Sequence, residues 1–251
     1  MVISHQHKFI FIKTAKTAGT SVEAFFSPRC GPDDVFTPTR PPVEGHQPRN
    51  WQGWFFPLKE ILSFNYPIDR RVFAERRFLT PKRTVADMVK RRKFHEHIPA
   101  RIVKQRVPPE VWNGYHKFTI ERNPWDKTLS HYHMQRSVRG GTMTLDEYFE
   151  RGEFCVNTSL YCDERGGLMV DEVIPYHELA AGIGRLCDRF GIPYEGSLGV
   201  RAKGDYRTDR RHYSEVLEPR HLEIIDRVYR KEIDMHGFIY EDHRNPTPQT
   251  P

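Results

Sequence analysis

The sequence has few cysteines and no long apolar run. Its four cysteines are unevenly spaced and form no CxxC pair, so neither a zinc site nor a disulfide framework is predicted. We expect free, mostly buried thiols, as in a reducing cytoplasm. No stretch approaches the ~20 apolar residues that a membrane span needs, and the opening MVISHQHK lacks the apolar core of a signal peptide. The sequence therefore predicts a cytoplasmic protein without a membrane span.

A strong charge of one sign is also missing. The chain of 251 residues has a formal net charge of +6, which suits an anionic ligand but lacks the dense basic tracts of dedicated nucleic-acid arms. Its 37% hydrophobic content is enough for one sizeable core. We expect one domain over residues 1–243, with an aromatic and basic insertion at about 28–95, and a disordered tail over 244–251.

Three short segments have the composition of strands. Residues 9–12 form a continuous β-prone run, typical of a strand buried on both faces. Residues 115–121 alternate in part, and residues 173–176 form a third short run. Because helical patterns follow these strands, the sequence predicts a three-layer α/β domain with a central parallel sheet flanked by helices.

Helix boundaries are also marked. Thr20 is a suitable N-cap for the first helix, with Glu23 at the capping-box spacing. Residues 81–93 predict a basic helix with an apolar side of Val85, Met88 and Val89. Pro219 opens a last helix that we expect to continue to Gly237.

The first predicted strand runs into a turn of small residues. A strand, such a turn and a helix start together favour phosphate binding, because backbone N–H groups and the helix dipole point at the anion. Lys16 lies in the turn, Gly19 permits a close approach, and Lys13 is less well placed. The lysine precedes the glycine, so this is not a Walker A loop, and no Mg-bound nucleoside triphosphate is predicted. A tight connection without a ligand is the alternative.

Two segments resemble a known family. AKTAGTS at residues 15–21 resembles the PKTGGTS-type 5′-phosphosulfate loop of sulfotransferases that use 3′-phosphoadenosine 5′-phosphosulfate (PAPS), with Ala15 in place of the usual Pro. FTIERNPWDKTLSHYH at 118–133 is similar to that family's 3′-phosphate motif, in which an Arg and a Ser eight positions later contact the phosphate. Here these are Arg122 and Ser130. The resemblance is weaker elsewhere, and it is closer to the carbohydrate-type branch than to the phenol-type branch.

The resemblance implies a nucleotide-binding, P-loop-like α/β fold and sulfuryl transfer from PAPS to an acceptor hydroxyl by in-line displacement. Lys16 would stabilise the charge that grows on the departing phosphate. We expect no metal, since a sulfuryl group carries less charge than a phosphoryl group and cationic side chains can serve. The loop residues implied to cradle the same phosphate are Thr17, Ala18, Gly19, Thr20 and Ser21.

The reaction also needs a proton acceptor. KFHEHIPARIV at 93–103 offers His95, Glu96 and His97, and relatives carry a His followed by Ala and Ile at a similar place. We expect His97 to be the general base, with His95 as the second choice. A surface histidine is the alternative.

The segment RAKGDYRTDRRHY at 201–213 resembles the basic loop that closes over the nucleotide in relatives. The resemblance implies contacts from Lys203, Gly204 and Tyr206. A solvated charged loop is the alternative. Relatives often have Arg-Tyr-Glu at the end of the third strand, whereas this chain has Pro-Tyr-His, so no role is assigned to His177.

The acceptor is less well indicated. Trp51 and Trp54 beside Arg49 could stack on sugar rings while cations face an acidic glycan, or they could pack under a long loop. A carbohydrate hydroxyl is the first expectation, and a lipid or small-metabolite hydroxyl is the alternative.

Two other classes remain as rivals. A phosphoryl transferase would need a Walker lysine and an acidic Mg ligand, which the sequence does not indicate. A non-enzymatic polyanion or nucleic-acid binder is suggested by the pI of about 9.1 and by KRRK at 90–93. It leaves the two phosphate-type turns unexplained, so no nucleic acid is expected as a partner.

Overall fold

The computed structural model describes residues 1–63, 72, 75, 79–199 and 209–244. The protein is α/β, with a mixed five-stranded sheet in the order β3-β1-β2-β4-β5. The strands are β1 (Val2–Ser4), β2 (Phe9–Phe11), β3 (Val35–Phe36), β4 (His116–Glu121) and β5 (Glu172–Pro175).

The sheet is parallel only in part. β4 pairs in parallel with β2 and with β5, whereas β1 pairs antiparallel with both β2 and β3. The predicted parallel pairing is therefore confirmed for the three predicted strands, but the sheet as a whole is mixed. β1 and β3 have only three and two residues, too few to show a strand period in the sequence.

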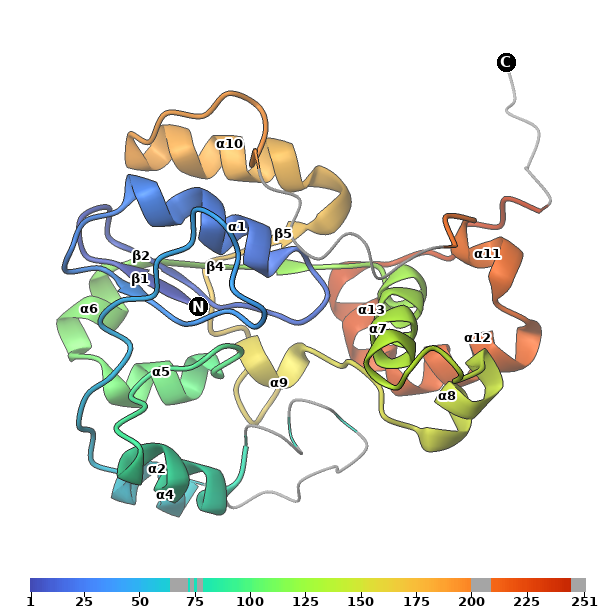
Figure 1. Ribbon diagram of the computed structural model, residues 1–251, viewed down its shortest axis with the longest axis horizontal. Coiled ribbons are helices and arrows are strands. Elements are labelled where there is room, and N and C mark those ends of the chain that lie inside the picture. Colours follow the sequence, from blue (N-terminus) through green and yellow to red (C-terminus); the bar gives the residue numbers. More distant parts are fainter. Residues whose placement is uncertain (64–71, 73–74, 76–78, 200–208, 245–251) are drawn as a thin grey trace.

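Helices cover both faces of the sheet, as predicted (Figure 1). On one face, α1 (Gly19–Phe26) and α10 (Leu179–Phe190) pack on Phe9, Phe11 and Phe118. The other face packs Ile10 and Ile12 against α5 (Ala100–Arg106), α6 (Pro109–Gly114) and α9 (Thr158–Tyr161). Alternate residues of β2 and its extension thus face opposite layers, which explains the unbroken apolar run.

A group of helices lies beside the sheet, at the right of Figure 1, and encloses a third cluster of buried side chains. Its helices are α7 (Pro124–Val138), α8 (Leu145–Arg151), α11 (Tyr213–Val216), α12 (Pro219–Val228) and α13 (Arg230–His236). The single helix expected from Pro219 to Gly237 is two helices, because Tyr229 has non-helical dihedrals (φ −101°, ψ 13°). The Tyr229 ring is buried and its hydroxyl accepts from Cys155 N at 3.0 Å.

The insertion carries α2 (Leu58–Ser63) and α4 (Pro81–Val89). A short 3-10 turn, η1 (Ser27–Arg29), lies at its start, and a second one, η2 (Tyr176–Glu178), follows β5. The predicted basic helix is α4, but the side that packs on the protein is not the predicted apolar side. Val85 and Val89 are exposed, whereas Thr84 and Asp87 are buried. Among the described residues, no helix has both the length and the apolar character to cross a membrane.

Candidate phosphate-binding site

The first turn, residues 12–18 between β2 and α1, has a left-handed backbone at two positions. Lys16 has φ 66° and Ala18 has φ 60°, a conformation that L-residues seldom adopt. The Thr14 and Thr17 hydroxyls, 2.8 Å apart, brace the turn. Helix α1 begins at Gly19 with Ala18 as N-cap and no side-chain cap. The predicted capping box at Thr20 is therefore wrong, and the first helical N–H groups are left to other partners.

Gly19 serves a purpose that the sequence did not indicate. A Cβ there would lie 2.7 Å from Lys13 Cγ, so the glycine makes room for the lysine stem beneath the turn. Lys13 Nζ donates to Glu23 at 2.6 Å and to Glu96 at 2.5 Å. Burial disfavours the ammonium, but the two carboxylates outweigh it and raise the pKa of Lys13. Lys13 is thus a buried, charged residue that supports the turn through its two ion pairs.

Asn157, which is buried and distant in the sequence, hydrogen-bonds to the first turn. Its Oδ1 accepts from Ala15 N at 3.0 Å, and its Nδ2 donates to Ala15 O at 3.1 Å and to Glu121 at 3.2 Å. Lys127 Nζ donates to Glu121 and to Glu232, and Glu232 accepts from Asn157 N. This buried network connects the turn to α7 and α13. No spacing in the sequence signals such a contact.

The second turn, residues 122–123 between β4 and α7, caps its own helix. Asn123 Oδ1 accepts from the next two N–H groups of α7, at 3.0 and 3.3 Å, as an N-cap should. Arg122 donates from Nε to Asp126 at 2.8 Å and from Nη1 to Lys16 O at 3.2 Å. Its guanidinium lies 4.3 Å from the centroid of the Tyr176 ring. The two turns are therefore in direct contact.

Both turns line one cavity of about 240 Å³. The predicted phosphate residues that line it are Lys16, Thr17, Ala18, Gly19, Thr20, Ser21, Arg122 and Ser130. The cavity is also lined by residues to which the sequence assigned no role: Lys13, Met134, Cys155, Tyr176 and Arg210. Tyr176 follows the end of β5, a position where ligand-binding residues of α/β sheets often lie. Burial raises the pKa of the Cys155 thiol to about 12, so it is not a ready nucleophile.

The histidines of residues 95–97 divide between the cavity and the interior. His97 and Glu96 line the cavity, whereas His95 does not. His97 Nδ1 lies 3.0 Å from Lys13 O, so this nitrogen carries the proton and Nε2 keeps its lone pair. Burial lowers the pKa of His97 to about 4. His95 Nε2 lies 3.5 Å from Asp87, and burial holds the His95 pKa well below its usual range.

The predicted acceptor residues do not line this cavity. Trp51 is half-buried against the core, and Trp54 is exposed with Arg91 4.8 Å above its ring. The Arg49 guanidinium donates to backbone carbonyls, including Gly31 O at 3.0 Å. The predicted closing-loop residues Lys203, Gly204 and Tyr206 lie outside the described residues, although Arg210 from the same segment lines the cavity.

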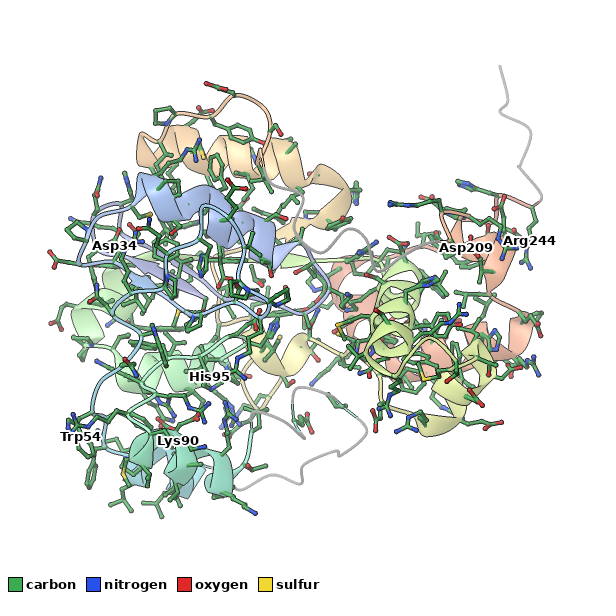
Figure 2. The ribbon with its side chains drawn as sticks, in the orientation of Figure 1. Asp34, Trp54, Lys90, His95, Asp209 and Arg244 are labelled. Carbon is green, nitrogen blue, oxygen red and sulfur yellow. The ribbon has the colours of Figure 1, made fainter. Side chains whose placement is uncertain are left out.

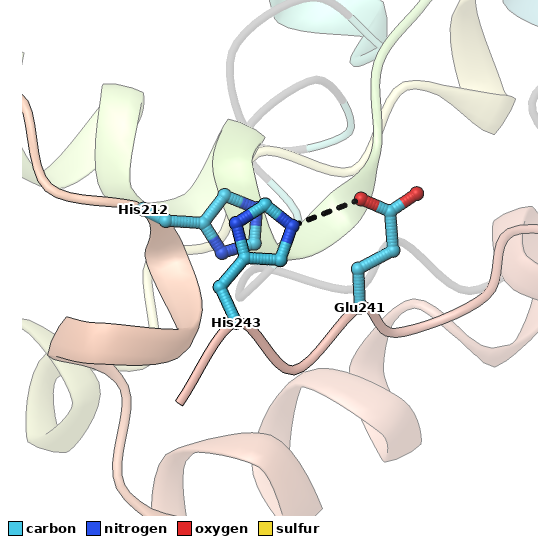
Figure 3. Close-up of side chains that lie close together, drawn as sticks. All are labelled: His212, Glu241 and His243. Atoms are coloured by element: carbon cyan, nitrogen blue, oxygen red, sulfur yellow. Dashed lines mark ion pairs between the residues drawn. The ribbon is translucent and has the colours of Figure 1, made fainter. Parts of the chain in front are cut away.

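One cluster of metal-ligand types occurs in the described part of the chain, formed by His212, Glu241 and His243 (Figure 3). The two imidazoles are stacked, with centroids 3.6 Å apart and planes 7° from parallel. The in-plane lone pairs of parallel rings do not converge on one ion. His212 Nδ1 lies 2.8 Å from Ser214 Oγ, which also accepts from His243 N at 3.0 Å. The cluster therefore fits a packing role for the C-terminal segment.

The chain was compared with known proteins. No family model and no solved structure matches it. A chain of Archaeoglobus fulgidus, described as an uncharacterized protein, is 26% identical over 113 residues, which are 43% of this chain and 94% of that one. That description names no activity, so the site's geometry and the two sequence motifs are the basis for a functional assignment.

Proposed function

We propose that the protein is a PAPS-dependent O-sulfotransferase with a P-loop-like, three-layer fold. The observation that carries the proposal is the contact between the two turns, in which Arg122 donates to Lys16 O while both residues line one cavity. Two anion sites so close together suit a ligand with phosphates at both ends of one nucleoside. The AKTAGTS and RNPWDKTLS segments, which resemble the family's two phosphate motifs, occupy these turns.

In this proposal the first turn binds the 5′-phosphosulfate. Its first helical N–H groups and the Thr20 and Ser21 hydroxyls provide donors, and Lys16 provides positive charge where the leaving phosphate gains charge. Lys13 stabilises the turn instead, because Glu23 and Glu96 already pair with it. PAPS supplies the sulfuryl group, and no step assigned to these residues requires a metal.

The second turn binds the 3′-phosphate. The Arg122 guanidinium is held by Asp126 and supported by the Tyr176 ring, so its remaining N–H groups are oriented before the ligand arrives. Ser130, two turns into α7, adds a hydroxyl on the same cavity wall. The positioning is built into a strand end and a capped helix, which are rigid supports.

His97 is the proposed base. Its protonated Nδ1 faces Lys13 O, which leaves Nε2 to accept the proton of the attacking hydroxyl. Because its pKa is about 4, the ring is neutral at physiological pH. Glu96 Oε1, 3.8 Å from His97 Nε2, can stabilise the imidazolium that forms. The proposed acceptor is a hydroxyl, first of a carbohydrate and otherwise of a lipid or small metabolite.

Thermal unfolding with adenosine 3′,5′-bisphosphate tests the proposal. At a hundredfold excess over Kd, the ligand should raise Tm by about 7 °C without Mg²⁺. Arg122→Ala should weaken binding about 50-fold, since a charge-assisted phosphate contact is lost. Arg139→Ala is the matched control, because Arg139 lies at the exposed C-terminal end of α7, the helix that follows Arg122. A shift with Mg·ATP or duplex DNA as large as that with the bisphosphate would contradict the proposal.

Two further variants separate binding from chemistry. Ser130→Ala should weaken the bisphosphate about fivefold, whereas Ser137→Ala, at an exposed position of α7, should not. His97→Asn should keep the thermal shift and lose transfer from labelled PAPS to hydroxyl acceptors. Loss of the shift in His97→Asn would make His97 a binding residue instead of the base.

A further inference from the structure

An exposed apolar surface lies on the insertion, away from the phosphate cavity. It is formed by the protruding side chains of residues 54–62 and of α4, and we name it the α2–α4 surface. Six of the nine large apolar side chains that are exposed in the described residues belong to it: Trp54, Phe56, Leu58, Leu62, Val85 and Val89. Apolar side chains gathered in this way usually mark a binding surface.

The charges around this surface all have one sign. The described segments 51–63 and 79–93 contain two carboxylates, Glu60 and Asp87, and both are buried. Glu60 pairs with Arg106, and Asp87 pairs with Arg83 and Arg92. The exposed charges there are cations: Lys59, Lys82, Lys90 and Arg91. Within these two described segments the surface presents apolar groups and positive charge, and neither carboxylate is exposed.

The surface is fixed to the body of the protein. Trp54 and Lys90 lie at the outer edge of the molecule, at the lower left of Figure 2. The bidentate Arg106–Glu60 pair, with contacts of 2.5 and 2.7 Å, ties α2 to α5. Protruding rings on a firm support can enter a soft, flat layer without a matching groove.

We propose that the α2–α4 surface docks on an anionic lipid bilayer. Trp, Phe and Leu side chains bordered by Lys and Arg are the composition of interfacial membrane-binding surfaces. The aliphatic stems of the lysines can lie along the lipid while their ammonium groups reach the headgroups. A bilayer with anionic lipids attracts each such cation. An acidic protein partner would also match the charge, but the strongly exposed side chains of Trp54, Phe56 and Leu62 favour insertion into lipid.

Backbone hydrogen bonds attach the docking surface to the segment that precedes the proposed base. Phe94 N donates to Trp51 O at 2.9 Å, Gly53 N donates to Arg91 O at 2.8 Å, and His95 lies 3.5 Å from Asp87 of α4. Asp87 is buried, whereas Val85 and Val89 of the same helix are exposed, so His95 lies on the side of α4 opposite the docking surface.

Sedimentation with vesicles tests the docking. The full chain should pellet with vesicles of phosphatidylcholine mixed with phosphatidylserine, pellet much less with phosphatidylcholine alone, and be released by salt. Lys59→Glu and Lys90→Glu should each lower the partition coefficient at least about fivefold. Arg227→Glu and Arg230→Glu, at exposed positions of α12 and α13, are the matched charge controls and should change it by less than about twofold.

The apolar contribution has its own control. Trp54→Ser combined with Phe56→Ser should lower vesicle binding at least about tenfold. Val138→Ser combined with Ile239→Ser removes equally exposed side chains elsewhere and should leave binding unchanged. Failure of the wild-type chain to pellet, an equal loss in the control pair, or binding only to an acidic helical peptide would overturn the proposal. Vesicle binding requires no nucleotide, so its failure is distinguishable from failure of the bisphosphate shift.

Discussion

The first turn and the second turn each join a strand of the parallel part of the sheet to a helix, yet different groups hold them in shape. The second turn is held locally, since Asn123 caps α7 and Arg122 pairs with Asp126 four residues on. The first turn is held by distant residues, with Asn157 bonded to both backbone groups of Ala15 and Glu96 paired with Lys13 beneath it. A local turn tolerates change elsewhere, whereas the first turn depends on contacts across the whole domain.

The largest expected difference between the turns concerns their two asparagines. Asn157→Ala should lower the free energy of unfolding by about 3 kcal/mol, because it leaves the buried Ala15 N without its partner and Ala15 O with only the weak Cys155 thiol donor. Asn123→Ala removes an N-cap and a long 3.3 Å hydrogen bond to the Tyr213 hydroxyl, and it should cost about 1 kcal/mol. Denaturant titration measures both values. Equal losses would show that the first turn does not depend on Asn157 and would remove the contrast.

The same contrast explains what could be predicted from the sequence. RNPWD at the second turn combines a strand end, an N-cap and a proline at the first helical position, all within five residues. The structure has these features, with Asn123 as the N-cap of α7 and Pro124 as its first residue. At the first turn the lysine and small residues were identified, but Thr20 was wrongly given the cap and Gly19 was assigned to the ligand. The true partners, Asn157 and Glu96, are distant in the chain, and only folding brings them there.

The fold shows the same limit. The apolar run at 9–12 predicted a strand with both faces covered, and helices do cover both faces. The antiparallel strands β1 and β3 were missed because they are too short to show a pattern. Val85 and Val89 of α4 were expected to face the core, yet Thr84 and Asp87 do so. Asp87 can be buried because Arg83 and Arg92 pair with it, and pairing of that kind is invisible to a hydrophobic pattern.

A smaller effect is expected from the glycine at the start of α1. Gly19→Ala should lower the free energy of unfolding by about 2 kcal/mol, since its Cβ would lie 2.7 Å from the Lys13 stem, which Glu23 and Glu96 hold in place. Gly114→Ala is the control, because nothing lies within 4 Å of a Cβ there. Thermal unfolding of the two variants measures the difference. An unchanged Tm for Gly19→Ala would show that Lys13 can move aside.

The smallest expected effect sharpens the comparison through pH, because His97 bonds to Lys13 O at the start of the first turn. The folded-state pKa of His97 is about 4, below the ordinary value of 6.5, so the unfolded chain binds its proton first as the pH falls. The stability that neutral His97 provides is complete above pH 6.5 and decreases toward pH 4. Asn tolerates the φ of 57° at this position and does not titrate. On going from pH 7 to pH 5, wild-type Tm should therefore fall by about 5 °C more than that of His97→Asn. His177→Asn, at an exposed position of η2, is the control, and parallel curves for wild type and His97→Asn would show that burial does not shift this pKa.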